Sequence, residues 1–142
     1  MAPVVGDIDE LAVAISHATA PAFMLGAVAA FLSILIGRLE RIADRNRALR
    51  SDGGAVDPSQ RDAIAAAFAR RMVLLGRAIF FAVLSALFTA ALLIAAFLAA
   101  LAGVTHGRIV ATMFAISLAL LIASLVELTR EIRIYMAHLH LE

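Results

Sequence analysis

The sequence predicts an all-α integral membrane protein: a three-helix bundle whose long helices extend beyond the membrane as an antiparallel hairpin. Hydrophobic residues make up 63% of its 142 residues, above the roughly 45–50% that is usual for soluble proteins. The excess lies in three uncharged runs of about 18 to 25 residues, close to the roughly 20 that a helix needs to cross a bilayer. Arginines gather beside these runs, as they do beside membrane spans. The runs are Ala18–Gly37, Ala78–Ala102 and Ile109–Val126.

The positions of the arginines predict the orientation of the chain. All twelve basic residues are arginine; nine lie between Arg38 and Arg77, and two follow the third run. Because basic residues collect on cytoplasmic flanks, we expect the first loop and the C-terminus in the cytoplasm and the N-terminus outside. The acidic start "MAPVVGDIDE" lacks the positive charge of a cleavable signal peptide. The expected segments are an outer segment 1–17, a span 18–37, a cytoplasmic hairpin 38–77 with its loop at 51–58, a span 78–102, an outer turn 103–108, a span 109–126 and a cytoplasmic helix 127–142.

Start and stop signals predict where each helix begins and ends. Asp7 with Glu10 has the spacing of a helix cap. Pro21 either marks the first turn of the first span or kinks a longer helix, and the helix then continues to Leu49. The breaker "SDGGAVDP" predicts the loop. Further helices are expected from about residue 60 to 102, where Gly103 closes the helix, and from about residue 108 to 138.

Apolar stripes predict how the helices pack. The apolar residues of the first two helices are spaced by three and four positions. When the two helices are placed antiparallel, each residue of the first stripe lies opposite one residue of the second, as in an antiparallel coiled-coil pair. A third stripe is expected to cover the open side. The first stripe is Leu35, Leu39, Ile42, Asn46 and Leu49, the second is Ile64, Phe68, Met72, Leu75 and Ile79, and the third is Leu125, Leu128, Ile132, Tyr135 and Leu139.

Charged residues where the spans meet the cytoplasm form the candidate site. A carboxylate at a membrane boundary is costly unless it is paired, and arginine suits that pairing. Asp44 is expected opposite Arg70. A salt-bridge network that fixes helix register, an ion or proton path through Glu127 and an anionic-lipid site all remain open. The predicted network is Arg38, Glu40, Arg41, Asp44, Arg45, Arg70, Arg71, Arg77, Glu127, Glu131 and Arg133.

Small residues at every fourth position predict close helix contacts in lipid. These stripes serve either packing within the bundle or self-association, and the sequence leaves both open. The stripes are Ala22, Gly26 and Ala30 in the first span and Ala111, Ala115, Ala119 and Ala123 in the third.

The sequence contains no pattern that indicates an enzyme. It has no cysteine, no phosphate-binding glycine loop and no nucleophile elbow, so we expect no catalytic residue, no cofactor and no metal. His138 and His140 lack the i, i+4 spacing of a metal pair. The run "RLERIADRNRALR" contains acids and no aromatic residue, which argues against nucleic acid; a helix lying on the membrane surface is the competing interpretation.

The order of these features resembles domain-of-unknown-function family 2721, a family of small bacterial membrane proteins. Four pieces carry the resemblance: Pro21, "RLERIADRNRAL", "RRMVLLGRAI" and "LTREIRIY". The resemblance implies three spans in the bacterial inner membrane and no assigned activity. It draws attention to Arg38, Asp44, Arg45, Arg71, Arg77, Glu131 and Arg133.

The leading hypothesis is therefore a non-catalytic structural or interaction protein, which associates with itself or serves as an accessory subunit of another membrane protein. A small oligomeric transporter or channel and an anionic-lipid-binding protein are the alternatives. The expected partners are membrane lipid and another membrane protein or a second copy of the chain.

Overall fold

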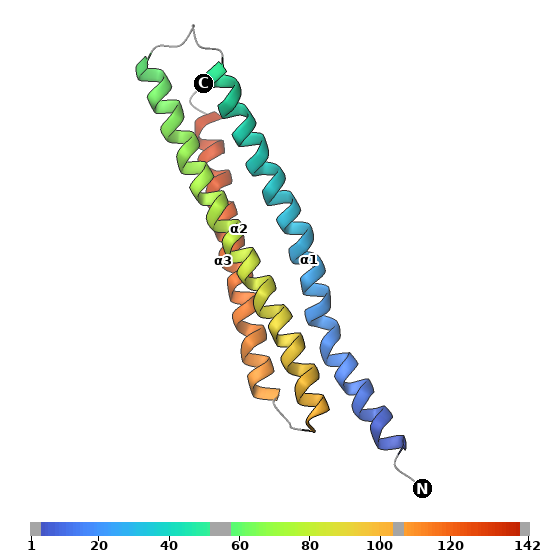
Figure 1. The fold of residues 1–142 in the computed structure, drawn as a ribbon. Helices are drawn as coiled ribbons and strands as arrows, with labels where there is room; N and C mark the ends of the chain where they lie inside the picture. The colour runs from blue at the N-terminus through green and yellow to red at the C-terminus, as the bar shows by residue number, and fades with distance from the viewer. Residues whose placement is uncertain (1–3, 52–57, 104–106, 140–142) are drawn as a thin grey trace.

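The computed structural model describes residues 4–51, 58–103 and 107–139, which form three long helices (Figure 1). Helix α1 spans Val4–Ser51, α2 spans Pro58–Leu101 and α3 spans Gly107–Leu139. Helix α2 returns alongside α1 as an antiparallel hairpin, and α3 runs back along α2. The predicted all-α three-helix fold is confirmed.

All three helices are long and apolar enough to cross a membrane. The stretches that qualify are Ala18–Ala48, Asp62–Leu101 and Gly107–Ile134, with mean hydropathies of 2.1, 2.6 and 2.6. Many large apolar side chains point outward, among them Phe23, which is 78% exposed, and Leu87 and Ile122, which are each 60% exposed. A water-soluble protein rarely leaves such surface uncovered. The protein is a multi-pass membrane protein.

The helix ends follow local chemistry, with one correction to the sequence prediction. Helix α1 already begins at Val4, so Asp7 lies inside the helix and does not cap its start. Pro21 also lies inside α1 and is buried, which selects the longer helix of the two alternatives. Gly103 ends α2 as predicted: its φ of +63° lies in the left-handed region, which glycine adopts without a side-chain clash.

Buried residues recur in each helix at steps of three, four or seven, the spacing of a left-handed coiled coil. Most residues of the predicted stripes of α1 and α2 meet in one core cluster, which includes Leu35 and Leu75, both 0% exposed, whereas Ile64 is 37% exposed. Met24 and Thr89, whose Sδ and Oγ1 atoms lie 3.9 Å apart, continue the same register toward the other end of the molecule. The buried series are Pro21, Met24, Val28, Leu35 and Ile42 in α1; Leu75, Ala78, Ala82, Ser85, Thr89 and Leu92 in α2; and Ser117, Ser124, Glu127 and Glu131 in α3.

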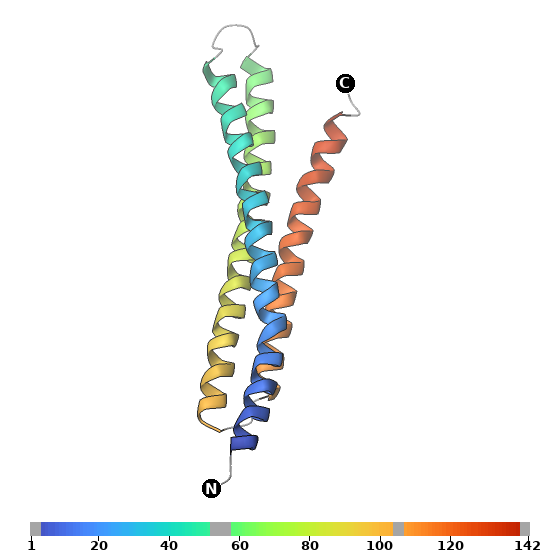
Figure 2. The same cartoon turned by 90° about the vertical axis from the view of Figure 1, so that its right-hand side faces the viewer.

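Helix α3 does not cover the hairpin along its whole length. It packs mainly on α2 and meets α1 at few points, and Figure 2 shows its C-terminal half diverging from α1 and α2. Leu128 packs against the core as predicted, whereas Leu125 and Ile132 are 44% and 37% exposed. The buried face of α3 is instead the one that carries Ser124 and Glu131, so the predicted third stripe is rotated partly outward.

Candidate functional site

Glu131 of α3 joins all three helices. Its side chain is 2% exposed. The Oε2 atom accepts a hydrogen bond from Nη1 of Arg38 on α1 at 3.1 Å. The Oε1 atom accepts two hydrogen bonds from Arg71 on α2, from Nε at 3.1 Å and from Nη2 at 2.8 Å. A buried carboxylate is tolerated when charge-assisted hydrogen bonds replace its lost hydration, and two guanidinium groups supply them here.

Glu127 lies one turn before Glu131 and is less completely satisfied. Its side chain is 6% exposed, and Oε1 lies 3.0 Å from Nη2 of Arg77. Its Oε2 atom is buried and accepts no hydrogen bond from any described residue. The nearest cation to this oxygen is Nη1 of Arg130, at 3.8 Å, beyond hydrogen-bonding distance. We call Arg38, Arg71, Arg77, Glu127, Arg130 and Glu131 the ionic layer.

The ionic layer is the last of a series of matched contacts along α2 and α3. Starting from Ser85 and Ser117, the next contact joins Ala78 to Ser124, and the next joins Arg71 to Glu131. Each step moves one heptad back along α2 and one heptad forward along α3, so a single antiparallel register places all of them. Met24–Ser117 and Arg38–Glu131 share the same sequence separation of 93, which places α1 in parallel register with α3.

Hydroxyl groups connect α2 and α3 within the apolar runs. Ser85 Oγ donates to the carbonyl oxygen of Ser117 at 2.8 Å, and Ser117 Oγ donates to the carbonyl oxygen of Ser85 at 2.9 Å. Thr89 Oγ1 lies 2.5 Å from Ser117 Oγ, and Ser124 Oγ donates to the carbonyl oxygen of Ala78 at 2.6 Å. All four side chains are 0% exposed. These hydroxyl groups therefore hold the helices together, as such groups do in lipid, and none is presented to a substrate.

The other predicted network residues lie away from the ionic layer. Asp44 does not meet Arg70. It forms an ion pair with Arg47, one turn along the same helix, at 3.2 Å between Oδ1 and Nη1, and both side chains are more than two-thirds exposed. The prediction is wrong because register fixes the level of a residue along the bundle but not the side of the helix on which it lies. Glu40, Arg41 and Arg45 are exposed on α1.

The network predicted from the sequence does not include Arg130. Its spacing of three residues from Glu127 puts both side chains on one face of α3, and this spacing was the signal that could have found it. The burial of Glu131 also had a signal. Ser117, Ser124 and Glu131 recur every seven residues, as do Phe114, Leu121 and Leu128, which pack against the core.

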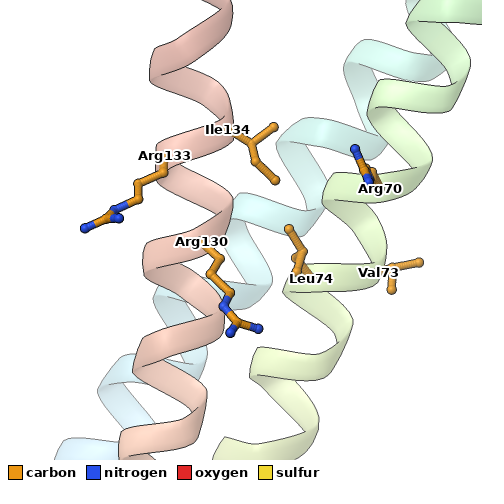
Figure 3. A pocket seen from close by; sticks show the side chains of 6 residues that line it. All are labelled: Arg70, Val73, Leu74, Arg130, Arg133 and Ile134. Carbon is orange, nitrogen blue, oxygen red and sulfur yellow. The ribbon is translucent and has the colours of Figure 1, made fainter.

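A basic groove opens between α2 and α3 beside the ionic layer, where α3 diverges (Figure 3). It has a volume of about 400 Å³ and is lined by Arg70, Val73, Leu74, Arg130, Arg133 and Ile134. In Figure 3 the side chain of Arg130 reaches toward α2, whereas that of Arg133 extends outward from α3. A second hollow on α3 shares Arg130 and Arg133 and adds Val126 and Thr129.

Both small-residue stripes face outward. Ala22, Gly26 and Ala30 on α1 are exposed, and so are Ala111, Ala115 and Ala119 on α3, while Ala123 is half-buried. A Cβ atom added to Gly26 would meet no atom within 4 Å. The contacts within the bundle therefore use other faces of these helices.

Comparison with protein families places the chain. The family described as "Protein of unknown function (DUF2721)" matches residues 18–141. The chain belongs to the DUF2721 family. Neither the curated proteins nor the solved structures contain a match.

The DUF2721 match covers the three spans and the whole ionic layer. The family description names no activity. The acids of the ionic layer are buried and held by arginines from α1, α2 and α3. This arrangement fixes the relative positions of the helices where the apolar spans end.

Proposed function

We propose that this DUF2721 protein is a non-catalytic interaction protein of the bacterial inner membrane, with its hairpin in the cytoplasm, and that it associates through its spans with a second copy of itself. An accessory role beside another membrane protein is the second form of the same proposal. The main support for this proposal is that both small-residue stripes face outward. Small residues let two helices approach closely in lipid, and here they lie where the chain itself does not use them.

The internal contacts support this proposal. The core residues, the inter-helix hydroxyl groups and the ionic layer already join the three helices. No packing role inside the bundle is left for Gly26 or Ala115, which are both exposed. A transporter or channel receives no comparable support, because the three apolar runs contain no charged residue and the buried hydroxyl groups bond to the helices rather than lining an open path.

Native mass spectrometry in mild detergent tests self-association. We expect dimers or larger assemblies of the unmodified chain. Gly26→Leu and Ala115→Leu should each weaken association about fivefold, because losing close helix contact costs on the order of 1 kcal/mol. Neither change should disturb the monomer, since both positions face outward.

Ala91→Leu is the matched control, because Ala91 is exposed on α2 outside both stripes. Equal weakening by the control would show that any added bulk on the spans has this effect. A strictly monomeric chain that carries no other protein from native membranes would overturn the proposal in both forms.

A further inference from the structure

The basic groove carries more positive charge than the neighbouring acids offset. Glu131 is already held by Arg38 and Arg71, and Oε1 of Glu127 by Arg77. Within the described parts of α2 and α3 the only other acid is Asp62, which lies two helical turns from Arg70. No described acid forms an ion pair with Arg70 or Arg133. Arg130, whose closest acid oxygen is 3.8 Å away, keeps hydrogen-bonding capacity for a ligand.

The groove also continues into the lipid-facing surface. Val73, which lines it, is 61% exposed, and Phe80 and Leu87 follow at steps of one heptad along the same face of α2, at 62% and 60%. On α3, Val126 of the adjoining hollow is 45% exposed. An occupant that fits both parts has an anionic end for the arginines and apolar chains that continue along the spans.

The position of the groove fits the same occupant. Arg130 and Arg133 follow the third apolar run within two turns, and Arg70 precedes the second run by two turns. The groove therefore opens at the level where a bilayer places its headgroups. Arginine binds phosphate oxygens with two parallel N–H donors, and basic pockets between spans on the cytoplasmic side recognise anionic headgroups.

We infer that the groove lined by Arg70, Arg130 and Arg133 binds the phosphate headgroup of an anionic phospholipid, whose acyl chains lie along Val73, Phe80 and Leu87. The site does not use the small-residue stripes, so it stands or falls independently of self-association. It also does not use Arg38 or Arg77, although both lie at the same boundary, because their side chains are engaged with Glu131 and Glu127.

Lipid binding by the full chain in neutral detergent tests the inference. Phosphatidylglycerol is titrated and counted by native mass spectrometry, with phosphatidylcholine as the neutral lipid. The Arg70→Gln/Arg133→Gln variant should bind phosphatidylglycerol on the order of 30-fold more weakly, since each arginine near the surface contributes about 1 kcal/mol. The control Arg41→Gln/Arg45→Gln removes equal charge from exposed positions on α1 and should change binding less than twofold.

The inference would be overturned by equal loss in both double variants, by no loss in the groove variant, or by equal binding of phosphatidylcholine. Displacement of the lipid by millimolar inorganic phosphate would reassign the groove to small anions and would overturn it as well. Arg133→Gln alone guards against misfolding, because Arg133 lines the groove from an exposed position on α3 and forms no ion pair with a described acid. It should weaken binding about fivefold with unchanged helix content.

Discussion

Burial determines how much an ion pair between an acid and an arginine contributes to stability, as a comparison of Glu131 with Asp44 shows. Asp44 and Glu131 are both acids beside an arginine. Asp44 is 71% exposed and keeps its water, so the pair with Arg47 is worth about 0–1 kcal/mol. Glu131 is 2% exposed and has exchanged water for the donors of Arg38 and Arg71. Removing its charge takes away the buried carboxylate that Arg38 and Arg71 share, and breaking a buried ion pair in this way is costly.

Glu131→Gln should therefore destabilise the folded protein by about 3 kcal/mol, measured as the free energy of unfolding in mixed detergent micelles. Asp44→Asn is the matched control, because it removes an equal charge from an exposed pair, and it should change stability by less than about 0.5 kcal/mol. Similar losses in the two variants would mean that the burial of Glu131 contributes nothing special.

At the scale of elements, the contact between α2 and α3 depends on polar groups inside the spans. Ser117 is the centre of this contact: it bonds to Ser85 in both directions and approaches Thr89. In lipid the hydrophobic effect does not drive helices together, so inter-helix hydrogen bonds and close packing carry more of the association. The register of α3 against α2 is set by these hydroxyl groups together with Glu131.

Ser117→Ala should cost about 1 kcal/mol of stability, near the usual value for an inter-helix hydrogen bond in a membrane. Ser33→Ala is the control, because Ser33 is exposed and its Oγ donates only to the carbonyl oxygen of Ala29 in its own helix, at 3.1 Å. Stability is read from unfolding in mixed micelles. If Ser33→Ala proved as damaging as Ser117→Ala, the inter-helix bonds would not be what holds α3.

The sequence predicted the elements better than the site. Long uncharged runs and the "SDGGAVDP" breaker dictate three helices almost without tertiary context, and the stripes of α1 and α2 dictate their pairing. The partners of Asp44 and Glu131 depend on rotation about the helix axes, which spacing alone does not determine. The hydroxyl contacts were also not predicted, because a serine in a span bonds equally well to its own helix. Only the seven-residue repeat of Ser117, Ser124 and Glu131 distinguishes a hydroxyl group that bonds to another helix from one that bonds to its own helix.

At the scale of the whole molecule, the cysteine-free chain allows a direct test of the predicted orientation. Ser51→Cys and Ala102→Cys place single thiols at exposed positions near opposite ends of the bundle. If the arginine-rich hairpin is cytoplasmic, a membrane-impermeant maleimide added to spheroplasts should label the thiol at position 102 and spare that at position 51. Permeabilised cells, in which both should react, are the control. Labelling at position 51 in intact spheroplasts would reverse the orientation.

Because α3 diverges from the other two helices, Glu131 acts as the pivot about which the C-terminal part of α3 can tilt. Beyond it the helix continues through Leu139, about 12 Å at 1.5 Å per residue, while α1 and α2 continue in another direction (Figure 2). A tilt of about 10° at Glu131 displaces the C-terminal end of α3 by about 2 Å, given that length. The ion pairs of Glu131 with Arg38 and Arg71 therefore set how far α3 separates from α1 and α2 at this end of the molecule. The basic groove lies where the helices separate.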